Sequence, residues 1–161
     1  MNKMVRTRDF YKTYWAIVKK CPYPKEAKLT HWLIKDGAKN KTTAYDEDPG
    51  GAKKSELTYR AIGKLNDHWL TEVRPITGRP HQIRVQLAKI GCPIRGDVRY
   101  GFKKLNPDRR SINLHAKEFH FVHPVKKENM HFKAPLPQDE FWQQFDTLDS
   151  IKSREIKQIL K

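Results

Sequence analysis

The sequence predicts an α+β fold, with one mixed but mainly antiparallel sheet and a few helices. Two features support this prediction. Short runs rich in β-branched and aromatic residues follow one another between turn-forming residues, and only residues 80–90 show a clear helical period. At 161 residues the chain is long enough for one domain, although hydrophobic residues make up only 37% of it. We expect residues 1–148 to form this domain and residues 149–161 to be a charged tail.

In the first half of the chain, composition and turn signals predict mainly strands. Residues 12–19 and 29–34 have the composition of short strands. Residues 35–55 are polar and basic and contain the turn signals DG and PGG, so we expect an exposed hairpin or loop there. Residues 56–62 and 68–75 follow as two strand-like runs, and the short segment between them suits an antiparallel hairpin.

Residues 80–90 give the clearest local prediction, an amphipathic helix. Its apolar residues recur at the spacing of one helical face, namely Ile83, Leu87 and Ile90. Pro80 suits the first helical position, where a missing N–H costs nothing. Gly91 suits the position just after the helix ends. We therefore expect the helix to begin at Pro80.

The second half continues the α+β pattern. Residues 94–110 predict a basic loop, and residues 112–122 and 130–134 predict two further strands. Residues 138–148 favour a helix with its aromatic side chains grouped on one side. Residues 151–161 are typical of a charged, amphipathic helix end.

The charge of the chain points to a polyanionic partner. Lys and Arg number 33 against 18 Asp and Glu, which gives a formal net charge of +15. Such a charge attracts polyanions rather than stabilising a compact fold. The chain also contains four Trp, six Tyr and seven Phe. Cations that meet phosphates and rings that stack on bases together predict nucleic acid, and RNA in particular, as the partner.

Other classes of protein are disfavoured by the sequence. Cys21 and Cys92 are the only cysteines, so neither a disulfide framework nor a cysteine zinc site is expected. No apolar run approaches the roughly 20 residues that span a bilayer. We expect a cytoplasmic protein with no metal, no cofactor and no membrane partner.

The most specific segment runs from Thr77 to Gly101. It reads TGRPHQIRVQL, then IGCPIRGD, then YG. Arg79, His81 and Arg84 gather near the expected start of the helix, where backbone N–H groups and the helix dipole also favour an anion. The alternative is a basic helix terminus that only meets solvent.

This segment resembles the RluA/RluD-type pseudouridine synthases, whose motif has the form TGRxHQIRxHLAxxGxPIxGDxxYG. The chain departs from it at Gln86, where the family usually has His. Residues 12–18 are similar to the family's KxYxAxV strand, and residues 114–124 to its later LHAxxLxFxHP strand. The resemblance covers roughly residues 3–146 and implies part of a pseudouridine synthase catalytic domain, with an isomerase activity on uridine in rRNA or tRNA.

The resemblance also implies roles for single residues. Tyr14 is similar to the tyrosine that stacks on the target uracil, Arg84 to the arginine that holds the catalytic aspartate, and Leu114 to the apolar residue under the base. We expect RNA contacts from Lys12, Arg79, His81, Gln82, Arg95, Arg99, Lys103 and Lys104. Asp97 is expected to form a turn.

The family's HRLDxxTSG segment, which carries the nucleophilic aspartate, has no counterpart in this sequence. We therefore expect Arg84 to be built for a carboxylate that this chain does not supply, and the chain alone to be inactive. A split gene product, an excised fragment and a natural pseudoenzyme all fit, and the missing N-terminal segment as a separate chain is one expected partner. The competing functions are an RNA-binding protein without chemistry and a basic structural protein of a ribonucleoprotein particle.

Overall fold

Seven strands form one antiparallel sheet in the computed structural model, which describes residues 10–146. The strands are β1 (Phe10–Val18), β2 (Glu26–Asp36), β3 (Lys41–Tyr45), β4 (Lys53–Leu65), β5 (His68–Pro75), β6 (Leu114–Val122) and β7 (Asn129–Lys133). The helices are α1 (Gln82–Lys89), the 3-10 turn η2 (Val98–Tyr100) and α2 (Glu140–Gln143). None of these helices is long and apolar enough to cross a membrane.

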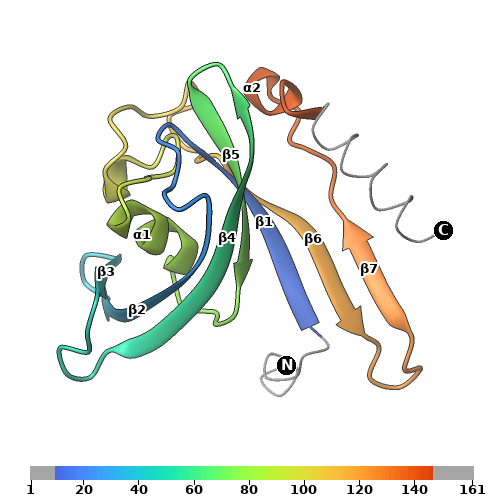
Figure 1. The fold of residues 1–161 in the computed structure, drawn as a ribbon, viewed down its shortest axis with the longest axis horizontal. Helices are drawn as coiled ribbons and strands as arrows, with labels where there is room; N and C mark the ends of the chain where they lie inside the picture. The colour runs from blue at the N-terminus through green and yellow to red at the C-terminus, as the bar shows by residue number, and fades with distance from the viewer. Residues whose placement is uncertain (1–9, 147–161) are drawn as a thin grey trace.

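The order of the strands in the sheet is β3-β2-β4-β5-β1-β6-β7. Every pairing between these strands is antiparallel, so the α+β prediction is confirmed, whereas the parallel pairing that a mixed sheet would contain does not occur among the described residues. The first strand of the chain lies between β5 and β6, and it therefore joins the two halves of the sheet (Figure 1).

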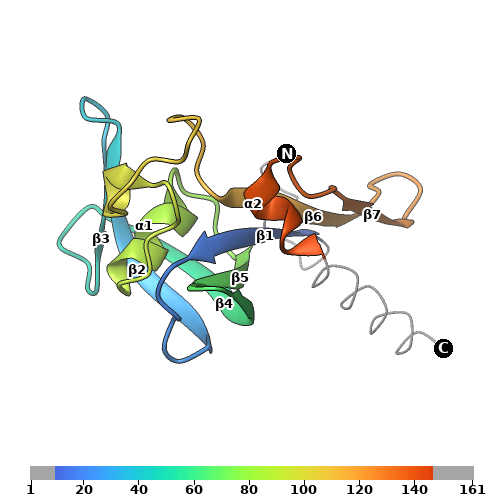
Figure 2. The same ribbon diagram turned by 90° about the horizontal axis from the view of Figure 1, so that it is seen from above.

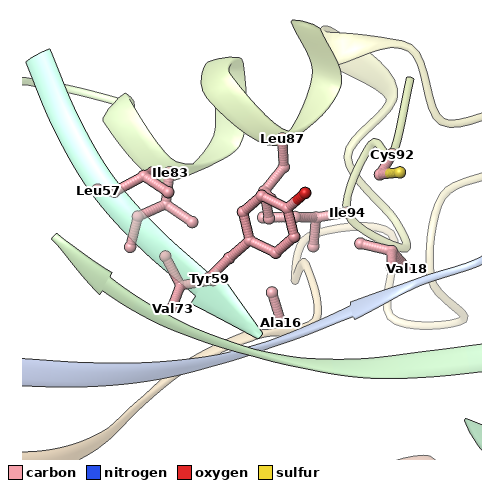
Figure 3. Packing of buried hydrophobic residues seen from close by; sticks show 9 residues of the cluster. All are labelled: Ala16, Val18, Leu57, Tyr59, Val73, Ile83, Leu87, Cys92 and Ile94. Atoms are coloured by element: carbon pink, nitrogen blue, oxygen red, sulfur yellow. The ribbon is translucent and has the colours of Figure 1, made fainter. Parts of the chain in front are cut away.

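The main core lies between the sheet and α1. Ile83 and Leu87 of the helix pack on residues of β1, β4 and β5, as Figure 3 shows. The cluster consists of Ala16, Val18, Leu57, Tyr59, Val73, Ile83, Leu87, Cys92 and Ile94, and we call it the helix-side core. Burying a Leu or Ile side chain contributes about 1.5–3 kcal/mol, so the predicted apolar stripe is what holds α1 on the sheet.

A second cluster covers the opposite face of β1. Trp15 and Ile17 pack there with Leu70, Leu136, Trp142 and Phe145. Residues 15–18 are consecutive and all buried, because alternate side chains enter the two clusters. The outer strands β6 and β7 extend away from α1, which leaves their helix-side face uncovered by that helix (Figures 1 and 2).

Two predicted helix boundaries were wrong. The first helix begins at Gln82 rather than Pro80, because His81 has a φ of 56°, in the left-handed region, and precedes the helix as its N-cap. The helix predicted over 138–148 is helical over Glu140–Gln143, where the Asp139 carboxylate accepts a hydrogen bond from the Trp142 N–H. The last part of that prediction, and the tail at 149–161, lie outside the described residues.

Candidate functional site

Tyr14 and Leu114 lie on the same face of the sheet. In the pairing of β1 with β6, Tyr14 is opposite Ala116, and Leu114 is opposite Ala16. Both side chains are partly buried against the helix-side core. Burial raises the pKa of the Tyr14 phenol, so its hydroxyl is neutral at physiological pH and can donate or accept a hydrogen bond. The two residues that the family motif singles out therefore adjoin one apolar surface.

A bulge in β6 sets the position of Tyr14. The register shifts between Thr13 and Tyr14, so that Glu118 is opposite Thr13 but Ala116 is opposite Tyr14. The additional residue, Lys117, is 1% exposed, and its Nζ donates to the Ala134 carbonyl at 2.9 Å. A bulge of this kind re-aims side chains and bends the strand. The sequence did not predict it, because no turn residue marks it.

A hollow of about 160 Å³ lies beside Tyr14. Its lining comes from β1, from β6 and from β7 with the residue after it, and comprises Lys12, Tyr14, Ala116, Lys117, Glu118, Phe119, Phe132 and Ala134. Of these residues, Tyr14 and Lys12 were predicted as site residues from the sequence, and Ala116 and Phe119 belong to the strand that resembles the family's LHAxxLxFxHP motif. Small and aromatic side chains form the apolar part of this lining, and Lys12, Lys117 and Glu118 are its charged residues.

Gln82 holds the segment between β5 and α1. Its Oε1 accepts hydrogen bonds from Thr77 Oγ1 at 2.8 Å and from the Arg79 N–H at 3.0 Å. Its Nε2 donates to the Glu56 carbonyl at 2.9 Å, and the residue is 4% exposed. The side chain is buried and both ends of its amide are engaged within the protein, and the expected contact of Gln82 with RNA stays a prediction.

Arg84 is paired with a carboxylate of the same chain. Its Nε and Nη2 donate to Asp97 Oδ2 and Oδ1 at 2.7 and 2.8 Å, and its guanidinium lies 4.9 Å from the centroid of the Tyr100 ring. The hydrogen bonds to Asp97 are the main cause that raises the pKa of Arg84. The expectation that this chain supplies no carboxylate to Arg84 was therefore wrong, and Asp97 does more than form a turn.

His81 and Tyr100 form a second polar contact beside this pair. The Tyr100 hydroxyl accepts a hydrogen bond from the Thr42 N–H at 2.9 Å and lies 2.7 Å from His81 Nδ1. The pKa of His81 is lowered, mainly by burial and to a smaller extent by the positive charge of the nearby Arg84. A pKa below the ordinary value of histidine favours the neutral imidazole in the free protein. Its contact with RNA stays a prediction.

Arg95 ties the loop after α1 to the rest of the domain. Its Nη1 donates to the side-chain oxygens of Asn106 and Asn113, both at 2.9 Å. Its guanidinium lies 3.8 Å from the centroid of the Phe141 ring. These internal contacts favour a structural role for Arg95 over the expected contact with RNA.

The other expected RNA contacts stay predictions, because no ligand is present to test them. Lys12, Arg99, Lys103 and Lys104 are exposed. Arg99 donates to the carbonyls of Lys39 and Asn40 at 3.0 and 3.2 Å. Arg79 is half-buried.

No group of three metal-ligating side chains gathers among residues 10–146. Cys21 and Cys92 are both free thiols, and Cys92 is buried.

Comparisons with known proteins give a consistent result. A family model described as RNA pseudouridylate synthase matches residues 1–89. The ribosomal large subunit pseudouridine synthase C of Buchnera aphidicola is 34% identical over 143 residues, which cover 84% of this chain and 45% of that protein. Its namesake from Vibrio cholerae is 30% identical over 148 residues, covering 84% and 44%. The chain thus spans less than half the length of these curated relatives.

A solved structure of human RNA pseudouridylate synthase domain containing 4 is similar in fold. The TM-score is 0.66 with 24% sequence identity, and the match covers 85% of this chain and 62% of that chain. At this identity the likeness concerns the fold alone.

Proposed function

The chain belongs to the RNA pseudouridylate synthase family, in its RluA-type branch, and from this premise we propose that it serves the isomerisation of uridine to pseudouridine in structured RNA, rRNA or tRNA, in the cytoplasm. The observation that carries the proposal is the placement of Tyr14 and Leu114. They adjoin one apolar surface, next to a hollow of about 160 Å³. A base flipped out of RNA needs such a surface and a ring to stack on.

The chemistry also requires a carboxylate. The N-glycosidic bond of uridine is broken, the base is turned, and a bond from C5 of the base to C1′ of the sugar replaces it. A carboxylate that attacks the sugar or the base makes this possible. We propose that a segment outside this sequence supplies it, and that this chain alone binds RNA without turnover.

The acidic residues near the site do not suit the role of nucleophile. Asp97 is 1% exposed and both of its oxygens accept from Arg84, so substrate cannot reach it. Glu118 adjoins the hollow, but its Oε2 lies 3.4 Å from His131 Nε2. His131 and Phe132 are neighbours in a strand and face opposite ways, so the Glu118 carboxylate points away from the Phe132 side.

A tritium-release assay tests this proposal. The full chain is incubated with RNA that carries 5-tritiated uridine, and RNA binding is measured in parallel by electrophoretic mobility shift. We expect binding without release. Release of tritium by the chain alone would overturn the proposed lack of a nucleophile, and absence of any RNA binding would overturn the proposed function itself.

A catalytically inactive RNA-binding protein is the second candidate. The observation that favours it is that the two carboxylates considered above are each engaged within the protein, Asp97 with Arg84 and Glu118 with His131. Reading the coding DNA ahead of the first codon separates the two. A frame that encodes HRLDxxTSG supports a split enzyme, and its absence there supports the binding protein.

A further inference from the structure

One face of β1, β6 and β7, which no helix among residues 10–146 covers, carries a row of aromatic residues. Lys12 is opposite Phe119, and Phe119 is opposite Phe132, so the three side chains cross the three strands on one face. The same face carries Tyr14, two residues further along β1. Neither α1 nor α2 lies over this part of the sheet in Figures 1 and 2.

Small side chains next to this row create the hollow. Ala116 is opposite Tyr14 on β6, and Ala134, directly after β7, is tied to Lys117 by a backbone hydrogen bond of 2.8 Å. Two methyl groups between Tyr14 on one side and Phe119 and Phe132 on the other leave the space of about 160 Å³. The hollow therefore has an apolar floor and aromatic walls.

Charge distinguishes this surface from an ordinary apolar patch. Lys12 is exposed, and its Nζ lies 5.7 Å from the centroid of the Phe119 ring and 5.8 Å from that of Phe10. Phe132 is 53% exposed. A ring open to solvent next to an ammonium group matches a nucleotide, whose base has a π-face and whose phosphate is an anion. With a net charge of +15, the chain favours this occupant over a basic or neutral polypeptide.

We propose that Phe132, with Phe119 and Lys12, forms a stacking subsite for a nucleobase of single-stranded RNA other than the target uridine. Lys12 contacts the phosphate of that nucleotide. The inference rests on the proposed function and deepens it. Lys12 is two residues from Tyr14, roughly 7 Å along β1, and Phe132 lies two strands further across the sheet, roughly 10 Å from Lys12. The target base at Tyr14 and a second base at Phe132 can therefore be held at once. Bases within a duplex are stacked already and are not available to this surface.

The test measures the affinity of the full chain for a fluorescein-labelled RNA hairpin with uridines in its loop, by fluorescence anisotropy. Phe132→Ala is expected to weaken binding about 5- to 150-fold, the range that corresponds to the stacking of one base. Phe132→Tyr keeps a ring and is expected to bind like the unaltered chain. Tyr45→Ala is the control, because Tyr45 is 37% exposed but belongs to the opposite edge strand β3.

A scan of abasic nucleotides identifies the base. At one loop position other than the target uridine, removal of the base should weaken binding of the unaltered chain and leave binding of Phe132→Ala unchanged. Affinity for a blunt duplex should not depend on residue 132. Thermal unfolding of each variant shows that it is folded, which the exposure of Phe132 leads us to expect.

The outcomes separate this inference from the proposed function. If the unaltered chain binds no RNA, the proposed function fails. If it binds, but Phe132→Ala binds the hairpin as tightly, the subsite does not exist and the aromatic face serves a polypeptide instead. Equal weakening by Phe132→Ala and Tyr45→Ala would also overturn it.

Discussion

Arg84 and Asp97 are joined by two parallel hydrogen bonds of 2.7 and 2.8 Å, and the Asp97 carboxylate is 1% exposed. The pair connects the first turn of α1 to Asp97, the N-cap of η2, and so fixes the loop that follows the helix. Guanidinium carries five N–H groups, of which this fork uses two. The Arg84 side chain is 20% exposed beside this pair.

Asp97→Asn should lower the free energy of unfolding by about 3 kcal/mol, because it leaves the guanidinium of Arg84 partly buried without its counter-charge. Urea denaturation of the full chain measures this. Asp46→Asn is the control. Asp46 contacts Lys89 at 3.5 Å with its side chain 77% exposed, and exposed pairs of this kind contribute about 0–1 kcal/mol. Equal losses in the two variants would contradict the structural importance of the Arg84–Asp97 pair.

Gly96→Ala should also destabilise the domain, by about 1–3 kcal/mol. Gly96 has a φ of +85°, and a Cβ there would lie 2.7 Å from Asn106 Cγ. Asn106 cannot move aside easily, because it is hydrogen-bonded to Arg95 and Asn113. The matched control is Gly37→Ala, where a Cβ would meet nothing within 4 Å. The difference between the two variants in urea denaturation is the quantity to compare.

Local patterns predicted the strands and α1 well. The apolar stripe of Ile83 and Leu87 does lie in the helix-side core, and within the predicted strand over 68–75 Val73 and Leu70 lie on opposite faces. These features depend on neighbours in the chain, which a sequence displays directly. The hairpin predicted over 56–75 is confirmed for the same reason.

The site itself was less predictable, because it depends on partners far apart in the chain. The Arg84–Asp97 pair spans 13 residues, and the contact of Gln86 Nε2 with His31 Nδ1, at 2.9 Å, spans 55. At this position, where the family motif has His, Gln86 is buried and its amide meets a histidine from β2. The bulge at Lys117, which shapes the hollow, leaves no local signal in the sequence.

Stability should fall as the solution is acidified below about pH 6.5, the ordinary pKa of histidine. Burial lowers the pKa of His31, His68 and His81 in the folded state. The unfolded chain therefore binds more protons than the folded chain in this window. The contribution of these histidines to the free energy of unfolding is complete above the unfolded pKa and is lost as pH falls through the lower, folded pKa values. Urea denaturation between pH 5 and pH 8 measures the slope.

The variant His31→Gln shows how much of this dependence of stability on pH comes from His31. Removing one titrating group lowers the slope by at most about 1.4 kcal/mol per pH unit. Glu56, Asp67 and Asp108 have lowered pKa values as well, but carboxyl groups titrate at lower pH and leave the histidine window unaffected. A stability that rises on acidification from pH 7 to pH 5 would refute the prediction.

Binding to RNA should weaken steeply with salt, and Lys103 and Lys104 should account for part of that dependence. Each lysine that neutralises a phosphate contributes roughly 0.7–0.9 to the slope of log affinity against log salt concentration. Lys103→Ala with Lys104→Ala should therefore reduce the slope by about 1.5, measured by anisotropy over a salt series.

The matched control removes Lys126 and Lys127, which are exposed in the turn between β6 and β7. Lys127 has a φ of 56°, so Asn is the suitable replacement there. Both double variants lose the same charge, so an equal reduction of the slope would assign the effect to net charge alone, whereas a reduction confined to 103 and 104 locates RNA on the loop after α1.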